Sequence, residues 1–116
     1  MPHIKLETTS CVVENQDVVD ILEHLVKKLA SFETVKPASI KAYHALRNTW
    51  VLGEGHPQGF VHCEVAILTG RDDALKARIA DGMYEELLAC FKASVESKEA
   101  GITMELREMD AAIYRK

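Results

Sequence analysis

Residues 60–68 read Phe60-Val61-His62-Cys63-Glu64-Val65-Ala66-Ile67-Leu68. Side chains of an extended chain alternate between its two faces, so the odd-numbered positions form one apolar face while Phe60, Ala66 and Leu68 add apolar groups to the other. A strand that is apolar on both faces needs cover on both. Self-association is the simplest source of the second cover, and a β-bulge or an extra element is the alternative.

Further strands are predicted on either side of this segment. Alternation of apolar and polar residues predicts a first strand over residues 2–8 and a last strand over residues 102–109. A mixture of β-branched, aromatic and small residues predicts a long strand over residues 39–52. Turn-forming residues 53–59 separate that strand from the one at 60–68.

Two amphipathic helices connect the strands. Apolar residues at three- and four-residue spacings predict a helix over about residues 16–34, with Asn15 or Asp17 as its N-cap. A four-residue apolar spacing predicts a second helix that follows Gly70-Arg71-Asp72 and ends at Gly101.

The element order is therefore β-α-β followed by β-α-β. This order predicts an α+β fold, in which a doubled β-α-β unit forms a four-stranded mixed sheet with two helices on one face. With 116 residues and 47% apolar content, the chain has the size and apolar material for a single domain over residues 1–116.

Charge and composition narrow the class of protein. The net charge is -4 and no block of Lys or Arg is present, so we expect no nucleic-acid partner. No apolar run approaches the roughly 18 residues of a membrane span, and no signal-peptide pattern begins the chain, so we expect a cytoplasmic protein without a membrane partner. Three cysteines far apart in sequence do not form a disulfide framework.

Pro2 is the first candidate for chemistry. A free α-amine has an ordinary pKa of about 7.7 to 8.0, close to the working pH that suits a general base. The proline ring would fix the direction of the nitrogen lone pair once Met1 is removed. The simpler interpretation is that Pro commonly follows an initiator Met without any catalytic role.

The chain resembles the 5-carboxymethyl-2-hydroxymuconate isomerase family, a branch of the tautomerase superfamily. The likeness covers nearly the whole chain and rests on fragments that occur in the same order, namely Met1-Pro2-His3, Pro37, Thr49-Trp50, Phe60-Val61-His62, Gly70-Arg71, and Met83 with Glu86-Leu87.

This resemblance implies a homotrimer whose sheets face inward and whose pockets lie where subunits meet. It also implies a cofactor-free isomerase of aromatic catabolism. In the family, the processed proline moves a proton between the hydroxyl of a 2-hydroxydienoate and a carbon, which gives the 2-oxo tautomer. Arginines hold the substrate carboxylates. Pro2 occupies the position of the base.

Arg71 matches a family active-site arginine. Its place before the second helix also suits anion binding, because free backbone N–H groups and the helix dipole favour negative charge there, and an Arg fork fits a carboxylate. The alternative is a solvated loop arginine that pairs with Asp72 or Asp73. A second cation differs from the family. Lys41 occupies a position where the family has an arginine, and a lysine cannot reproduce the two-pronged contact of an arginine with a carboxylate. Arg47, of the same strand parity, is a candidate replacement.

Other candidate residues have weaker support. His62 and Trp50 are candidates for lining the substrate pocket, and a hydrogen-bonded strand histidine and a packed aromatic are the simpler interpretations. The five histidines have no recognised ligand spacing, so no metal site is predicted. Cys63 and Cys90 fall on apolar faces, which disfavours thiol catalysis.

Two further functions stay open at this point. A noncatalytic oligomeric binding or scaffold protein would retain the fold without the chemistry, as Lys41 suggests. An unrelated ferredoxin-like ligand-binding domain has the same order of strands and helices.

Overall fold

Four strands form one mixed sheet in the order β2-β1-β3-β4 in a computed structural model that describes residues 1–116. The strands are β1 (His3–Thr9), β2 (Lys41–Arg47), β3 (Gly59–Leu68) and β4 (Ala100–Met109). β1 pairs with β2 and β3 with β4 in parallel, while β1 and β3 are antiparallel. The predicted doubled β-α-β unit is confirmed.

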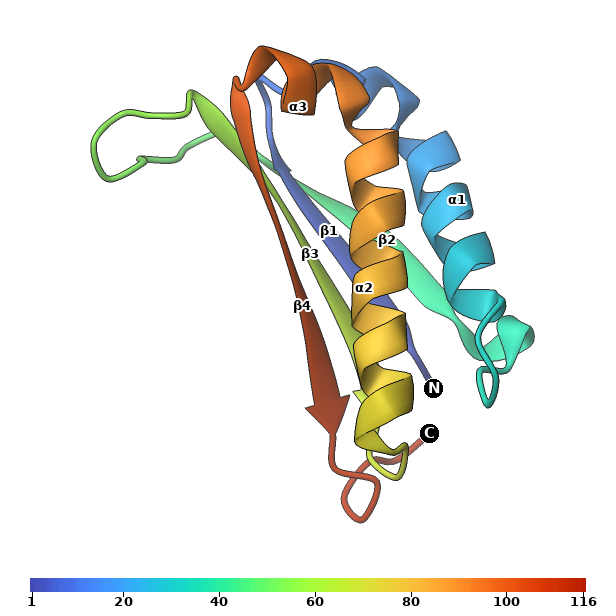
Figure 1. The fold of residues 1–116 in the computed structure, drawn as a ribbon. Helices are drawn as coiled ribbons and strands as arrows, with labels where there is room; N and C mark the ends of the chain where they lie inside the picture. The colour runs from blue at the N-terminus through green and yellow to red at the C-terminus, as the bar shows by residue number, and fades with distance from the viewer.

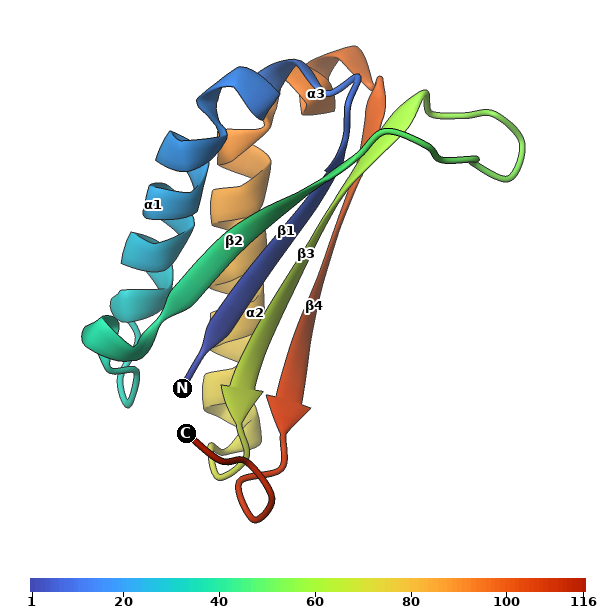
Figure 2. The same cartoon turned by 180° about the vertical axis from the view of Figure 1, so that it is seen from behind.

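All helices lie on one face of this sheet (Figures 1 and 2). α1 (Val18–Ala30) and α2 (Asp73–Cys90) are the two long helices, and α3 (Lys92–Ser97) follows α2 directly. Short 3-10 helices, η1 (Val13–Asp17) and η2 (Pro37–Ser39), precede α1 and β2. No helix is long and apolar enough to cross a membrane.

The core fills the space between the helices and the facing side of the sheet. The alternation predicted for the first strand is confirmed, because Ile4 and Leu6 are fully buried while Lys5 and Glu7 are only partly so. The odd-numbered residues of β3 form the centre of the core, and the buried residues of the helices pack on them: Ile21, Leu25, Leu29, Leu75, Ile79, Met83, Leu87 and Phe91.

The second predicted strand is shorter than expected. β2 covers residues 41–47, where the sequence predicts a strand over residues 39–52. β1 ends at Thr9, which pairs with Arg47, so the chain beyond Arg47 has no neighbour on this side to pair with. Residues 48–58 instead leave the sheet as a projecting loop (Figure 1).

The second predicted helix is interrupted. Phe91 leaves the helical region at φ -110 and ψ 36, and its fully buried side chain ends α2 in the core. α3 then begins in a new direction, held by the Glu14 carboxylate, which accepts bonds from the Ser94 amide at 3.0 Å and hydroxyl at 2.5 Å. The prediction that Gly101 ends the helix is wrong, since Gly101 lies inside β4.

Neither predicted N-cap of the first helix forms a side-chain capping bond. η1 runs directly into α1, so the helix continues an existing turn. The Asn15 side chain binds β1 instead: its Oδ1 accepts from the Thr8 hydroxyl at 2.5 Å, and its Nδ2 donates to the Thr9 carbonyl at 2.9 Å.

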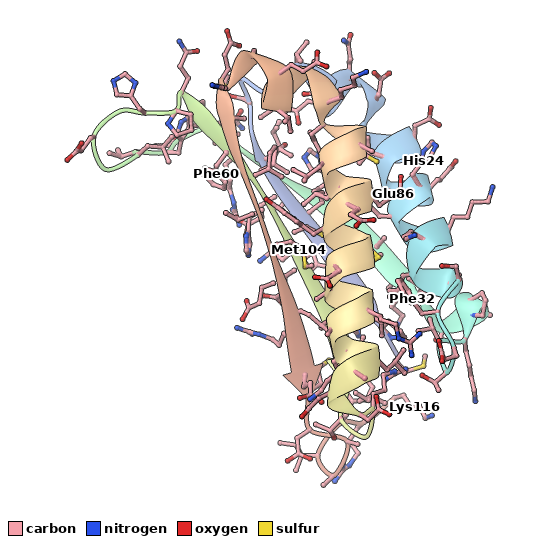
Figure 3. The ribbon with its side chains drawn as sticks, in the orientation of Figure 1. His24, Phe32, Phe60, Glu86, Met104 and Lys116 are labelled. Carbon is pink, nitrogen blue, oxygen red and sulfur yellow. The ribbon has the colours of Figure 1, made fainter.

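The face of the sheet away from the helices has no cover in one chain (Figure 2). Phe60 lies on this side (Figure 3), and it and Leu68 are only half-buried. Ala66 is already buried, because its small side chain lies between its register partners His3 and Arg107. Tyr43 and Ala45 of β2 and Met109 of β4 add apolar groups to this face, and most of its other positions are charged or polar.

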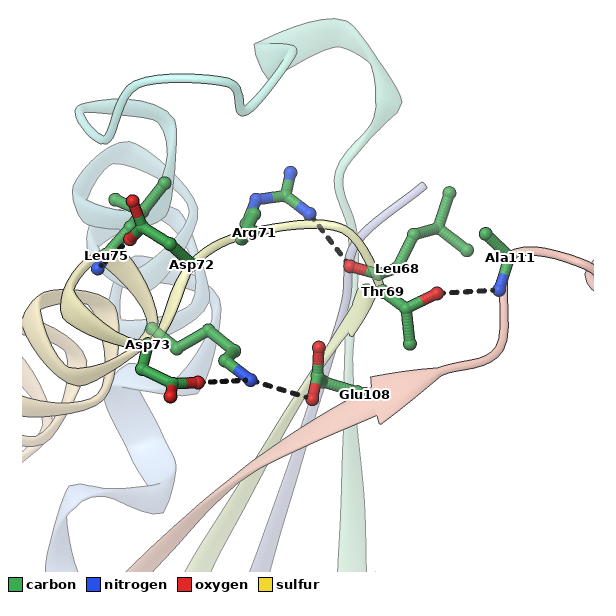
Figure 4. A network of polar contacts seen from close by, with 9 residues as sticks. Leu68, Thr69, Arg71, Asp72, Asp73, Leu75, Glu108 and Ala111 are labelled. Atoms are coloured by element: carbon green, nitrogen blue, oxygen red, sulfur yellow. Dashed lines mark hydrogen bonds and ion pairs between the residues drawn. The ribbon is translucent and has the colours of Figure 1, made fainter.

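Asp72 is the N-cap of α2. The Asp72 carboxylate accepts the Leu75 amide at 2.8 Å, as Figure 4 shows. Because this bond satisfies an otherwise free helix donor, Asp72→Ala is expected to cost about 1 kcal/mol of stability. Chemical denaturation measures this loss. Asp73→Ala is the matched control, since it removes only an exposed ion pair with Lys76. Equal losses in the two variants would contradict the capping role.

Candidate active site

The amino terminus lies at the end of the sheet where the carboxyl terminus also returns (Figures 1 and 2). Burial, followed by the charges of Lys116, Arg71, Lys36 and Lys41, lowers the pKa of the terminal amine. Each cation disfavours the protonated amine, so the neutral form gains population near neutral pH. This end of the molecule therefore combines a depressed amine pKa with four positive charges.

Pro2 directly follows Met1, whose amine this is, and its side chain is buried. Its carbonyl accepts the Lys41 amide at 3.1 Å, which fixes the start of β2 beside the start of β1. With Met1 present, the Pro2 nitrogen is part of a peptide bond and has no basicity. Removal of Met1 would turn that nitrogen into the chain's terminal amine at the same end of the sheet.

Arg71 lies in the turn between β3 and α2, and its guanidinium is held by two backbone carbonyls and one hydroxyl. Nη1 donates to the Leu68 carbonyl at 3.1 Å (Figure 4), Nε donates to Thr34 Oγ1 at 2.9 Å, and Nη2 donates to the Thr34 carbonyl at 3.1 Å. It forms no ion pair with Asp72 or Asp73. Three of the five N–H hydrogens of the guanidinium are thus used, and two remain for an anion.

The carboxyl-terminal segment closes this end of the site. The Tyr114 hydroxyl lies 3.0 Å from His3 Nε2, and the Ala111 amide donates to Thr69 Oγ1 at 3.0 Å. These contacts bring Lys116 to the start of α2 (Figure 3). Sequence reasoning missed Lys36 and Lys116. Adjacency to Pro37 was a weak signal for Lys36, and nothing local marked Lys116.

The remaining predicted site residues lie toward the opposite end of the sheet from Pro2. Arg47 pairs with Thr9 at the far end of β1, roughly 20 Å from Pro2 at the usual rise per strand residue. It forms an ion pair with Glu7, with Nη2 2.8 Å from Oε2. Trp50 lies in the projecting loop and donates Nε1–H to the Gln58 carbonyl at 2.9 Å. His62 Nδ1 lies 2.7 Å from Thr103 Oγ1 on the uncovered face.

Two cysteines and one histidine away from the amino terminus have structural roles. Burial raises the pKa of the Cys63 thiol to about 12 and that of Cys90 to about 11, which leaves both in the unreactive thiol form. Burial also lowers the pKa of His44, whose Nε2 lies 2.7 Å from the Thr8 hydroxyl. No group of three or more His, Cys, Asp or Glu side chains is arranged to hold a metal ion.

Pro2 lines none of the three main grooves of one chain. One groove, of about 560 Å³, lies between α1 and the β2 edge and is lined by Leu22, Val26 and Ala42 among others. A second, of about 520 Å³, lies at the β4 edge beside Pro57, Tyr84 and Leu88. Both flank the outer strands of the sheet.

Several solved structures share this fold. It shares its fold with a 5-carboxymethyl-2-hydroxymuconate isomerase from Deinococcus radiodurans R1, at a TM-score of 0.88 and 24% identity over 99% of this chain and 87% of that one. A 5-carboxymethyl-2-hydroxymuconate delta-isomerase gives a TM-score of 0.87 at 14% identity, over 100% of this chain and 87% of that one. A fused 4-OT symmetric trimer gives 0.71 at 16% identity, over 93% and 85%.

A search of curated proteins found no match to the sequence. The doubled β-α-β fold agrees with these neighbours, and a family match over residues 2–116 identifies an isomerase of the tautomerase superfamily. Residues 2–116 match the family described as 5-carboxymethyl-2-hydroxymuconate isomerase. The chain belongs to that family.

Proposed function

We propose that this protein is a cytoplasmic, cofactor-independent tautomerase that converts a small 2-hydroxydienoate carboxylate, such as 5-carboxymethyl-2-hydroxymuconate, to its 2-oxo tautomer. Pro2, freed of Met1, is the general base. The observation that carries this proposal is that Lys36, Lys41, Arg71 and Lys116 all lower the pKa of the terminal amine, which belongs to Met1, the residue before Pro2. Family membership supports the substrate class.

The proposed reaction moves one proton and needs no redox partner. The neutral Pro2 nitrogen removes the proton of the 2-hydroxyl group, and the electron pair of the O–H bond forms the 2-oxo group. The conjugated double bonds shift along the chain, and the protonated amine returns the proton to a carbon. Cations near the substrate stabilise the negative charge that develops during transfer.

Arg71 is the proposed carboxylate clamp. Its fixed guanidinium, with two N–H hydrogens left, loses little conformational freedom when an anion binds. Lys41 adds a point charge from the start of β2, on the same side of the sheet as His3. A doubly charged substrate would thus meet one oriented donor group and one or more ammonium groups.

We further propose that a homotrimer completes the pocket. Arg47, Trp50 and His62 are too far from Pro2 of their own chain to contact the same small substrate, so they would act on a substrate held by a neighbouring subunit. Val51, next to Trp50, is 92% exposed and is therefore accessible for a contact with a neighbouring subunit. Two fused 4-OT trimers that share the fold, one symmetric and one asymmetric, support this assembly.

Sedimentation equilibrium is expected to give three times the chain mass of 12.9 kDa. Val51→Asp is expected to lower the trimer fraction, because it places a charge in an apolar contact. Val13→Asp is a matched control, since Val13 is also exposed but lies in η1, away from the projecting loop. A stable wild-type monomer would contradict the trimer proposal.

We expect the cations that lower the pKa of the Met1 amine to act in the same direction on the Pro2 amine of the processed protein, which predicts the pH dependence of activity. The neutral amine is the active form, so kcat/KM should rise with pH and level off above the amine pKa. Lys41→Gln removes a positive charge that disfavours the protonated amine, so the acid limb should move to higher pH. Lys92→Gln, an exposed lysine of α3 at the other end of the sheet, is the control and should leave the limb in place. A limb that does not move in Lys41→Gln would contradict this electrostatic role.

A further inference from the structure

Thr34 has a backbone conformation that is unusual for its residue type. Its φ is 70°, in the left-handed region, where a β-branched residue is strained. Helix termination does not explain this conformation, because α1 ends at Ala30 and its C-cap Ser31 is right-handed. Thr34 is the third residue of a β-turn, in which the Val35 amide donates to the Phe32 carbonyl at 3.4 Å. A positive φ at this turn position usually selects glycine or asparagine, so the turn alone does not account for a threonine. The only other non-glycine residue with positive φ, Lys98, directly follows the end of α3.

The conformation of Thr34 directs two oxygen atoms at one side chain. Its Oγ1 accepts from Arg71 Nε at 2.9 Å, and its carbonyl oxygen accepts from Arg71 Nη2 at 3.1 Å. These two bonds are on the Nε and Nη2 edge of the guanidinium, and the Leu68 carbonyl accepts a third bond from Nη1 at 3.1 Å. A planar guanidinium bonded at three nitrogen atoms has a fixed orientation.

Arg71 is not the sole anchor of this loop. Arg78 of α2 donates to both carboxylate oxygens of the neighbouring Glu33, at 2.9 and 3.2 Å. Val35, on the other side of Thr34, is buried in the core. The loop is therefore attached to α2 and to the core without the Thr34 side chain, and a glycine at this position could form the same turn without strain.

We infer that Thr34 is a positioning residue, whose hydroxyl and carbonyl orient the Arg71 guanidinium so that its remaining N–H hydrogens bind a substrate carboxylate. This inference rests on the proposed function, since it assigns the specificity for an anionic substrate to the pair formed by Thr34 and Arg71. The strain at Thr34 persists because the pair determines the geometry of the site.

Three substitutions separate orientation from stability. Thr34→Val keeps the shape and the strain but removes the acceptor hydroxyl. Thr34→Ser keeps the hydroxyl and is the conservative rescue. Thr34→Gly removes both the hydroxyl and the strain, so its melting temperature should equal or exceed that of the wild type.

The first measurement needs no substrate. In 15N-edited NMR of the Met1-free protein, the Arg71 Nε–H signal is expected to exchange slowly with water in the wild type and in Thr34→Ser, and rapidly in Thr34→Val. Arg71→Lys assigns the signal by its loss. Equal exchange in the wild type and Thr34→Val would overturn the inference.

The second measurement is steady-state turnover of a 2-hydroxymuconate-type dienol. Thr34→Val and Thr34→Gly are expected to raise KM about tenfold, with a smaller change in kcat. A tenfold change corresponds to the loss of one hydrogen bond to a charged group. Thr34→Ser should stay within about twofold of the wild type on the same scale. A raised KM in Thr34→Gly without loss of stability would distinguish orientation from a structural role. Unchanged KM in Thr34→Val would overturn the inference.

Failure of the proposed function would give a different result. The Nε–H contrast between Thr34→Val and Thr34→Ser would persist, while the Met1-free wild type would not turn over the dienol. In that case the orientation of Arg71 would stand, and the assignment to a hydroxydienoate carboxylate would be overturned.

Discussion

Met1-free Pro2→Ala is expected to lose at least about 10²-fold in kcat/KM toward a 2-hydroxymuconate-type dienol, the range of a general acid-base contribution. Alanine leaves a primary amine without the ring that fixes the lone pair, so the base loses its orientation. The fall in ultraviolet absorbance of the conjugated dienol measures the rate.

Retention of Met1 provides a second, independent test of the same nitrogen. In unprocessed protein the Pro2 nitrogen is a peptide nitrogen, and no turnover above the Pro2→Ala rate is expected. Mass spectrometry of each preparation establishes the state of the terminus. Equal rates for Met1-free wild type and Pro2→Ala would remove Pro2 from the mechanism and would favour the noncatalytic binding protein considered from the sequence.

Arg71→Ala is expected to lower kcat/KM by about 10²-fold, because it removes the only oriented guanidinium beside the terminal amine and leaves a bound carboxylate without a charge-assisted partner. Most of the loss should appear in KM if the carboxylate contact is equally strong in ground and transition states, and in kcat if it strengthens during proton transfer.

Arg78→Ala is the matched control for this variant. Arg78 also carries a guanidinium that binds the loop after α1, through Glu33, but it does not contribute to the lowered pKa of the terminal amine. Its removal should leave kcat/KM within about twofold, as expected for an exposed ion pair. Thermal melts of both variants show whether either has lost its fold. Equal losses of activity in Arg71→Ala and Arg78→Ala would contradict a clamp at Arg71.

The element types could be predicted from local sequence, while several boundaries could not. Apolar periodicity predicts the first and last strands and the two long helices, while residue composition and the turn-forming residues 53–59 predict the two middle strands. The end of β2 at Arg47 depends on where β1 stops, and the break at Phe91 depends on Glu14, which is 80 residues away along the chain from Ser94. Contacts between distant segments leave no local pattern.

The candidate site shows the same division. Pro2, Arg71 and Lys41 were predicted as site residues, and they lie at the same end of the sheet in one chain. Arg47 and Trp50 lie at the opposite end, because the parallel pairing of β1 with β2 carries the end of β2 away from Pro2. Lys36, Lys116 and Thr34 were not predicted, since their proximity to the amine or to Arg71 arises from chain folding alone.

The sequence by itself determined the α+β class, the core-facing residues of each element and the family, because each depends on residue type and spacing along the chain. Only the tertiary structure decided which charges surround the terminal amine, which groups hold Arg71, and which face of the sheet is left uncovered. The physical reason is that electrostatic and hydrogen-bond energies depend on distance in space, and residues far apart in a sequence acquire that distance only when the chain folds.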